Sequence, residues 1–320
     1  PPAIQDFLRR TALLPYLSSD LCNAYLDIAN AAALLDELER EHLFITPVNE
    51  ANRRRLRYHA LFQAFLQRCL ELEEGAAAVR AWHRRAATCL LANQDAPPQQ
   101  RLDDQSAAVD HFLAANEWTA AAQVIANLAD TLDFGNLPRL EPWFAHLPTE
   151  VTTANPRLLT ALGQLRERQG RWGEALAALQ QAERVAQSTG SIADLTQAYR
   201  WQAWVYFRQD RYAESIALCQ RALAVAPTDN AEELAAIYNI LANCYGNSGD
   251  LEQQQRYHRH ALELFRRLGH REREALILHN IAAYDLPQGL LREALETEQI
   301  SLHILDELHS YRICFPLITL

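Results

Sequence analysis

The 320-residue chain contains no methionine and no lysine, so every basic side chain is an arginine. Without a methionine the sequence has no initiator residue, and we expect it to be a segment of a longer protein. No apolar run approaches the roughly 18 residues that a membrane-spanning helix needs. Residues Pro1–Ile4 also lack the charged and apolar regions of a signal peptide. These absences argue against a membrane protein and against a secreted one.

Chemistry-bearing motifs are missing as well. The six cysteines are widely spaced and none forms a CxxC pair, which indicates buried apolar residues in a reducing compartment. We therefore expect a cytoplasmic protein without disulfides or a metal site. The sequence has no GxxxxGK[ST] phosphate loop, no GxSxG and no HExxH. It predicts that this chain is not an enzyme and binds no cofactor on its own.

Charge separates the chain from generic nucleic-acid binders, because its formal net charge is −10. One basic run, Arg53–Arg57 (RRRLR), is the exception. One interpretation is that this run contacts DNA phosphates. The alternatives are that it is solvated or that it docks on another domain. The acidic pairs Asp103–Asp104 and Glu73–Glu74 lie in polar stretches. We expect them to be exposed, as solubilising charges or helix ends.

Residues 1–75 predict a small helical domain with a wing. Apolar residues at helical spacing and polar starts predict three helices, over 6–14, 21–28 and 30–43. Two short strands, at 43–46 and 56–58, flank a polar turn. His59 then leads into a closing helix, whose apolar positions are Leu61, Phe62, Phe65, Leu66 and Leu70. Three helices, a two-stranded wing and a closing helix make a winged-helix domain.

Two stretches of this domain carry a family resemblance. LLDELEREHLFITPV and RYHALFQAFLQRCL resemble the winged-helix domain of the MalT family, large bacterial LuxR-type regulators built on a STAND-class ATPase. The resemblance implies that an ATPase domain, which binds ATP or ADP, precedes the winged helix. It also implies that a superhelical repeat domain follows, and that a LuxR-type DNA-binding domain closes the protein. This chain would hold the middle part and lack the domains that bind nucleotide and DNA.

His59, in the RYHALF stretch, acquires a role by the same resemblance. In related STAND proteins a histidine at this place contacts the phosphates of bound ADP and holds the resting state. Imidazole suits that role because it donates to phosphate oxygens and titrates near neutral pH. Ala60 stands where plant and animal members often have an acid. The alternative is a histidine that caps the helix and packs against the wing.

Residues 76–156 predict connecting helical hairpins. Apolar spacing indicates helices over 79–91, 107–114, 118–132 and 140–147, with a proline-containing loop at Ala96–Gln100. The stretch HFLAANEWTAAAQVIANLA resembles the MalT-family segment that joins the winged helix to the repeats. Nothing in this region indicates chemistry.

Residues 157–320 contain four units that recur about every 40 residues. A large residue opens the second helix of each unit, at Trp172, Tyr212, Leu251 and Leu291. Nine residues earlier each unit has a small residue, at Gly163, Ala203, Ala242 and Ala282. This alternation resembles the tetratricopeptide repeat, with longer helices because the usual period is 34. The chain therefore predicts a mainly α fold, a winged helix followed by an α-solenoid.

The repeat pattern weakens toward its end. Polar residues take core positions in the third and fourth units, at Gln254, His258, Glu298 and Ser301. The last residues, Phe315–Leu320, are apolar and uncapped, whereas solenoids end in polar caps. We expect the repeat domain to be truncated here and to continue in the longer protein.

The concave surface of a solenoid is lined by the first helix of each unit, on the face opposite the packing within the unit. Positions with this phase are Arg200, Trp204, Phe207, Asn239, Asn243 and His279. Asn239 and Asn243 are one helical turn apart, and paired amides can clamp a peptide backbone or sugar hydroxyls. Arg200 beside Trp204 offers a charge with a stacking surface. The alternative is a solvated groove wall in which Trp204 packs between repeats.

These observations favour the sensor and coupling segment of an ATP-dependent bacterial transcription regulator. In this hypothesis the groove binds a small-molecule inducer or a regulatory protein. The winged helix then relays the event to the ATPase domain and releases the ADP-held resting state. The second hypothesis is a protein–protein interaction scaffold without a small-molecule site. A third is direct DNA binding through Arg53–Arg57. None of them requires a membrane.

Overall fold

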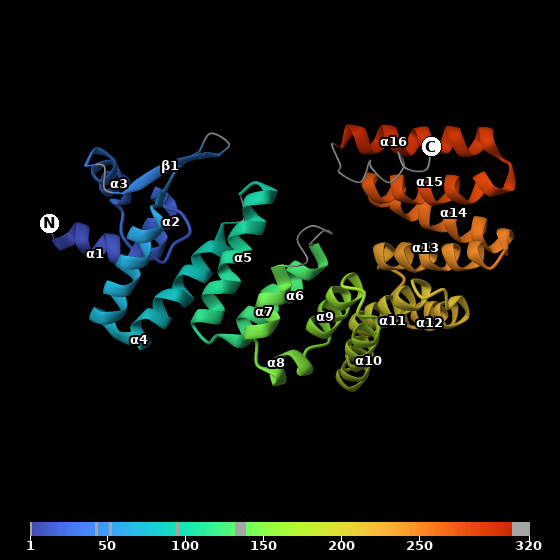
Figure 1. The fold of residues 1–320 in the computed structure, drawn as a ribbon, viewed down its shortest axis with the longest axis horizontal. Helices are drawn as coiled ribbons and strands as arrows, with labels where there is room; N and C mark the ends of the chain where they lie inside the picture. The colour runs from blue at the N-terminus through green and yellow to red at the C-terminus, as the bar shows by residue number, and fades with distance from the viewer. Residues whose placement is uncertain (1, 42–43, 51–52, 94–95, 132–138, 309–320) are drawn as a thin grey trace. The chain divides into compact units, whose positions relative to one another are not determined.

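The computed structural model describes residues 2–41, 44–50, 53–93, 96–131 and 139–308 (Figure 1). Residues 1–152 and 153–320 form two compact units. The prediction that the repeats are truncated depended on the apolar end Phe315–Leu320. These residues lie outside the described residues. No described helix is both long enough and apolar enough to cross a membrane.

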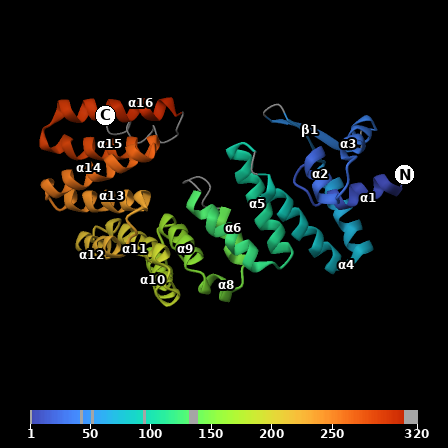
Figure 2. The ribbon, with the colours of Figure 1, turned by 180° about the vertical axis from the view of Figure 1, so that it is seen from behind.

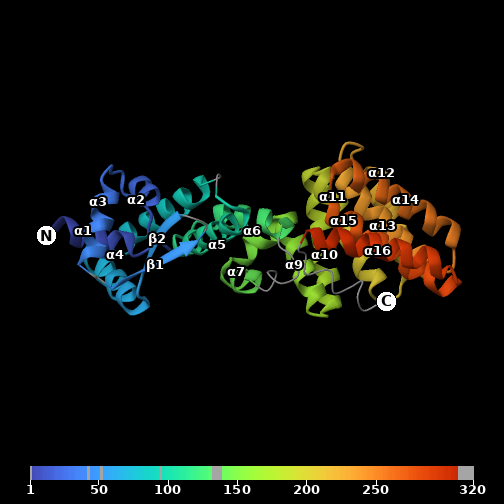
Figure 3. The same cartoon turned by 90° about the horizontal axis from the view of Figure 1, so that it is seen from above.

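The first unit begins with the predicted winged helix. Its elements are α1 (Pro2–Thr11), α2 (Ser19–Leu26), α3 (Ala31–Arg40), β1 (Ile45–Glu50), β2 (Arg53–Tyr58) and α4 (Ala60–Ala92). The Ser18 side chain accepts a hydrogen bond from the Leu21 backbone and so caps α2. β1 and β2 pair antiparallel, with Ile45 opposite Tyr58, and lie side by side in the view from above (Figure 3).

A small apolar core holds this domain together. Leu14, Tyr25, Leu38 and Leu56 are almost completely buried, as the apolar periodicity requires. The Thr11 and Tyr58 hydroxyls lie 2.7 Å apart, so α1 and β2 are also joined by a buried hydrogen bond. The mainly α fold with a winged helix at its start is confirmed.

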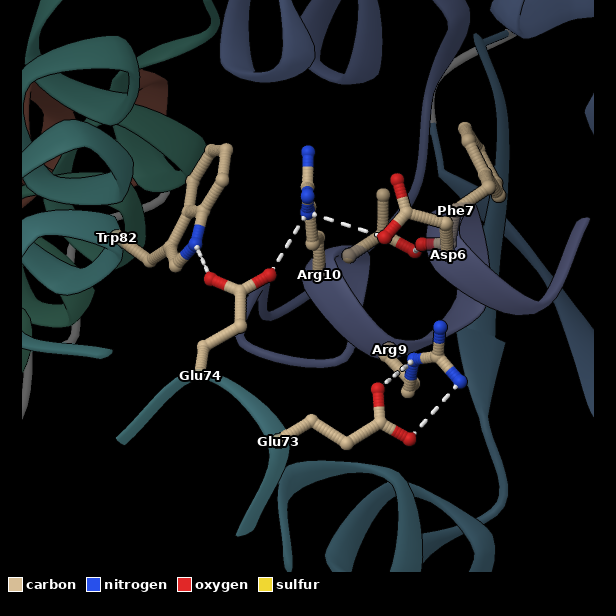
Figure 4. Close-up of polar contacts among 8 residues, drawn as sticks. Asp6, Phe7, Arg9, Arg10, Glu73, Glu74 and Trp82 are labelled. Carbon is tan, nitrogen blue, oxygen red and sulfur yellow. Dashed lines mark hydrogen bonds and ion pairs between the residues drawn. The ribbon is translucent and has the colours of Figure 1, made fainter. Parts of the chain in front are cut away.

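The closing helix and the next predicted helix run into one another as α4, with a kink at Gly75. Gly75 has φ 80° and ψ 164°, a left-handed conformation that glycine adopts most readily. Directly before this kink, Glu74 accepts hydrogen bonds from Arg10 (3.1 Å) and Trp82 (2.6 Å), as Figure 4 shows. Glu73 pairs with Arg9. The acidic pair therefore marks a helix end, as predicted, and also ties α4 to α1.

Three further helices, α5 (Pro98–Ala114), α6 (Trp118–Thr131) and α7 (Leu140–His146), complete the first unit up to a short α8 (Thr149–Ala154). The expectation that Asp104 is exposed is wrong. Its carboxylate is buried and accepts hydrogen bonds from Tyr16, Asn93 and Gln100. Burial raises the pKa of Asp104, and these donors oppose the rise.

The described residues of the second unit contain four helix pairs, which Figure 2 shows stacked in succession. They are α9 (Pro156–Arg168) with α10 (Trp172–Thr189), α11 (Ile192–Phe207) with α12 (Tyr212–Val225), α13 (Ala231–Asn247) with α14 (Leu251–Leu268), and α15 (Arg271–Asp285) with α16 (Leu291–Glu307). Every second helix begins at the large residue that the sequence period marks. The predicted solenoid is confirmed.

Small residues set how closely the helices approach. A Cβ atom on Gly163 would lie 2.5 Å from Leu179 Cγ, so this crossing admits no side chain. In the next helix pair, α11 with α12, Ala203 is fully buried and its carbonyl accepts a hydrogen bond from Ser215. Toward the end of the array the core becomes polar, as predicted. Its buried polar side chains include Gln254, His258, Glu298 and Ser301.

Candidate functional sites

His59 occupies the N-cap position of α4, at the foot of the wing. Its backbone N–H donates to the Phe44 carbonyl (2.7 Å), which joins the start of α4 to the residue before β1. The imidazole makes no capping hydrogen bond and is exposed. Because the ring has no partner among the described residues, it is free to donate to a phosphate oxygen. The capping alternative accounts for the position of His59 but not for its side chain.

Large exposed apolar side chains follow this histidine along α4. Leu61, Phe65 and Leu72 lie along one face of α4 and are 61–78% exposed. Phe44, before β1, is 64% exposed and its ring lies 5.2 Å from that of Phe62. We call Phe44, Leu61, Phe65 and Leu72 the apolar stripe. Soluble proteins seldom expose large apolar groups together unless something docks on them.

The structure divides the apolar positions of the predicted closing helix. Leu66 and Leu70 are buried in the domain core, whereas Leu61 and Phe65 are exposed. Helical periodicity finds apolar positions, but it does not tell which of two apolar faces is covered by the rest of the domain. The signal available in the sequence was that α4 is apolar on more than one side.

The arginines of the wing are largely engaged within the domain. Arg54 pairs with Asp36 (2.6 Å) and with Glu39. Arg55 is buried, stacks on the Tyr16 ring (4.6 Å) and donates to Gln100. Arg57 is exposed, and the Arg53 side chain lies outside the described residues. Two of the four guanidinium groups therefore stabilise the fold, which does not favour DNA binding through this run.

In the repeat unit, Arg200 and Trp204 face different partners. The Arg200 guanidinium pairs with Glu233 on α13 (2.6 Å) and stacks on Trp201 (4.8 Å), not on Trp204. Trp204 and Phe207 have ring centroids 5.5 Å apart and pack, half-buried, against the core of the second unit in the array. Trp204 therefore has the packed position that was the alternative to a ligand contact.

The remaining groove candidates are held by hydrogen bonds between helices. Asn239 accepts from Asn280 on α15 (3.0 Å). The Asn243 amide oxygen lies 3.2 Å from His258 Nε2 on α14, and Asn243 is 7% exposed. His279 Nδ1 lies 2.8 Å from a Glu298 carboxylate oxygen on α16.

The assignment of Asn243 and His279 to the face opposite the packing within the unit is therefore wrong. Each points at the second helix of its own unit, because a buried polar residue there supplies a partner. The side-chain amides of Asn239 and Asn243 thus form hydrogen bonds with different helices, α15 and α14. A ligand-binding role for the six groove residues stays a prediction.

Comparison with known proteins identifies the first of these domains. The family described as the MalT winged helix domain matches residues 1–78. These residues are a MalT-type winged helix. Two tetratricopeptide-repeat families match residues 160–230 and 235–267, so the MalT-like chain joins this domain to tetratricopeptide repeats.

Curated relatives carry the likeness through both units. The HTH-type transcriptional regulator MalT of Cronobacter sakazakii is 27% identical over 314 residues, 95% of this chain and 33% of that protein. MalT of Klebsiella pneumoniae is 31% identical over 181 residues, 56% of this chain and 19% of that protein. The MalT-like chain thus spans at most about a third of the length of these relatives.

A solved structure supports the same fold. The STAND protein with a tetratricopeptide-repeat sensor from Pyrococcus horikoshii is 12% identical, with a TM-score of 0.56. The match covers 99% of this chain and 52% of that one. At this identity the likeness concerns the fold alone. The chain resembles a part of the MalT transcriptional regulators, and its first domain matches the MalT winged helix.

Proposed function

We propose that this chain is the sensor and coupling segment of an ATP-dependent transcription regulator. The repeats bind an inducer or a regulatory protein, and the winged helix docks on an ATPase domain of the same protein. DNA is read by a further domain outside the chain. The chain itself catalyses no reaction.

The observation that carries this proposal is the apolar stripe beside the free imidazole of His59. Leaving Leu61, Phe65 and Leu72 in water costs free energy that docking recovers, at about 25 cal/mol per Å² of apolar surface. The occupant we infer is the ATPase domain, because the curated relatives are about three times as long as this chain. The imidazole of His59 then lies at the edge of that interface, where it can donate to an ADP phosphate.

The relay follows from differential binding. A ligand in the repeats changes the docking equilibrium only if it binds one of the two states more tightly. A shift from mostly docked to mostly undocked requires a preference of about 10⁴ between the states. Release of the winged helix removes the His59 contact, so nucleotide exchange becomes faster.

The test of the relay uses the full-length protein with labelled ADP bound. We expect His59→Gln to speed ADP release about tenfold, since a hydrogen bond to a charged group contributes at least 1.5 kcal/mol. Phe65→Ser should also speed release, because it removes apolar surface from the docking interface. Ile192→Gln is the matched control, because Ile192 is also an exposed apolar residue but lies in the repeat unit. Unchanged release in both variants would contradict the proposed docking.

The sensor half is tested separately on the chain itself. Thermal-shift measurements against small sugars and signal metabolites, together with a pull-down, should find a ligand or a regulatory protein that raises Tm. Capture of a protein with no small-molecule response would favour the interaction scaffold instead. No response of either kind would contradict a sensor role.

A further inference from the structure

The second helices of two neighbouring units, α10 and α12, flank a hollow of about 470 Å³. Its floor is formed by α11, through Gln202 and Tyr206, and Leu218 of α12 lines its side. Arg184 and Arg221 reach into it from the two walls. The volume is within the range of sites that hold small organic molecules. None of these residues belongs to the groove that the sequence predicted.

The hollow exists because one aromatic pair is missing. At the corresponding place between the next units, Tyr257 stacks on Tyr245 with ring centroids 5.6 Å apart and planes 7° from parallel. In the 40-residue alignment Tyr245 corresponds to Tyr206, whereas Tyr257 corresponds to Leu218. Because leucine is smaller than tyrosine, the space that the second ring would fill stays open.

The polar lining is specific to this pair of units. Residues that serve only the repeat framework should recur at each period. Glu183, Arg184 and Gln202 do not, since the corresponding residues of the next unit are Leu223, Ala224 and Leu241. Gln202 is only 3% exposed, and its amide donates to Glu183 at 2.9 Å. A buried, oriented amide at the floor of an open hollow indicates a built site.

Contacts with two neighbouring side chains hold Arg221 in one orientation. One of its terminal nitrogens donates to both Glu183 (2.7 Å) and the Tyr199 hydroxyl (2.8 Å). The guanidinium also stacks 4.2 Å from the centroid of the Tyr199 ring. Its other two nitrogens, Nε and NH1, have no hydrogen-bond partner among the described residues. A fixed guanidinium with free donors loses little entropy when it binds an anion.

The charges of the hollow leave a positive excess. The Glu183 carboxylate is paired with Arg221 (2.7 Å). Glu214, the other acid in the lining, is paired with Arg211 outside it (2.7 Å). Arg184 has only an exposed hydrogen bond of 3.4 Å to Gln181. The free donors and the unpaired charge favour an anion rather than a cation or a metal ion.

We propose that this hollow binds a small organic carboxylate. The carboxylate lies between Arg184 and Arg221, and the apolar body of the ligand packs on Leu218 and Tyr206. Arginine suits this role because its donors match the two oxygens of a carboxylate. This inference deepens the sensor half of the proposed function and rests on it, but not on the docking of the winged helix.

The experiment is calorimetric titration of the whole chain with 3-phenylpropionate and with its neutral amide. We expect the acid to bind and the amide not to. Arg184→Gln should weaken binding about tenfold, as loss of a charged hydrogen bond does. Its control is Arg259→Gln, an exposed arginine on α14. Ala217→Phe, an exposed lining position, should block the hollow without disturbing the core, and Ala193→Phe is its control.

Several outcomes would overturn the proposal. The proposal is wrong if the acid does not bind at concentrations up to about 10 mM, because a site with a millimolar Kd is mostly filled there. Equal binding of the amide, or equal losses in the Arg259→Gln control, are others. If the titration fails while ADP release still responds to His59→Gln, the carboxylate site is wrong and the coupling role stands. If the acid binds as expected while ADP release is unchanged in His59→Gln, the carboxylate site stands and the coupling role is wrong.

Discussion

The Nδ1 atoms of His83 on α4 and His111 on α5 lie 2.8 Å apart, with ring centroids 5.1 Å apart. A hydrogen bond between two imidazole nitrogens needs a proton on one and a lone pair on the other, so the accepting ring is neutral. Burial lowers the pKa of His83, and it lowers that of His111 to about 4. Protonation of either ring places a charge in the interface between α4 and α5, and protonation of the accepting nitrogen also removes the hydrogen bond.

The first prediction is a loss of stability in mild acid. The His111 pKa is lower in the folded chain than when unfolded, so between pH 6.5 and about 4 the unfolded state binds more protons. The free energy of unfolding therefore falls as the pH drops through this window, by up to about 3 kcal/mol. Urea unfolding of the first unit at pH 7.5 and pH 5, followed by tryptophan fluorescence, measures the loss.

His111→Gln should flatten this dependence because it removes the titrating ring. His146→Gln is the control, since His146 is exposed on α7 of the same unit. An unchanged pH dependence in His111→Gln would show that other groups cause the loss.

The second prediction compares two neighbouring residues of α4. Phe65 is exposed in the apolar stripe, whereas Leu66 is buried in the domain core. Phe65→Ser should change the free energy of unfolding by no more than about 0.5 kcal/mol, as exposed substitutions do. Leu66→Ala should cost about 2–5 kcal/mol because it leaves a cavity. Denaturant titration of both variants decides; comparable losses would mean that the stripe is covered within this chain.

The third prediction concerns the close helix crossing at Gly163. Gly163→Ala places a Cβ atom against Leu179 Cγ, and overpacking of this kind costs about 1–3 kcal/mol. The cost exceeds the gain of about 1 kcal/mol in helix propensity, so the variant should have a lower Tm. Gly173→Ala is the matched control, because a Cβ atom on Gly173 meets nothing within 4 Å. It should be neutral or stabilising by up to about 1 kcal/mol. A higher Tm for Gly163→Ala would contradict the packing.

The fourth prediction concerns Arg200 and Glu233, whose side chains are 17% and 9% exposed. Arg200→Ala leaves a largely buried carboxylate without its partner and should destabilise the second unit by about 3 kcal/mol. Adding Glu233→Ala should recover part of this loss, which a double-mutant cycle by urea unfolding measures. Additive losses would mean that the pair contributes no coupling. A binding defect of Arg200→Ala alone is therefore not evidence for a ligand contact.

Most of the fold was predictable because it is periodic. The winged helix followed from three helices with regular apolar spacing and a short apolar hairpin before His59, and the solenoid from the 40-residue recurrence. The spacing of apolar residues along the chain indicates where helices begin, for example at Trp172 and Tyr212. These properties depend on near neighbours in the chain, which the sequence displays directly.

The candidate sites were less predictable because they depend on distant neighbours. Asp104 looks like a solvated acid beside Asp103, yet Tyr16, 88 residues away, supplies a buried donor. Asn243 has the phase of a groove residue, yet His258 turns it inward. Whether a polar group is exposed depends on the partners that the fold brings close to it. The spacing of residues within one helix does not identify these partners.

The amino-acid sequence by itself determined the order of the domains, the period of the repeats and the absence of a phosphate loop, GxSxG and HExxH. Only the tertiary structure decided which apolar face of α4 stays uncovered beside His59. It also decided that Leu218, where the next unit has Tyr257, leaves a hollow between α10 and α12. The reason is physical. Periodicity is a property of consecutive residues, whereas exposure and empty space depend on the volumes of side chains from different helices.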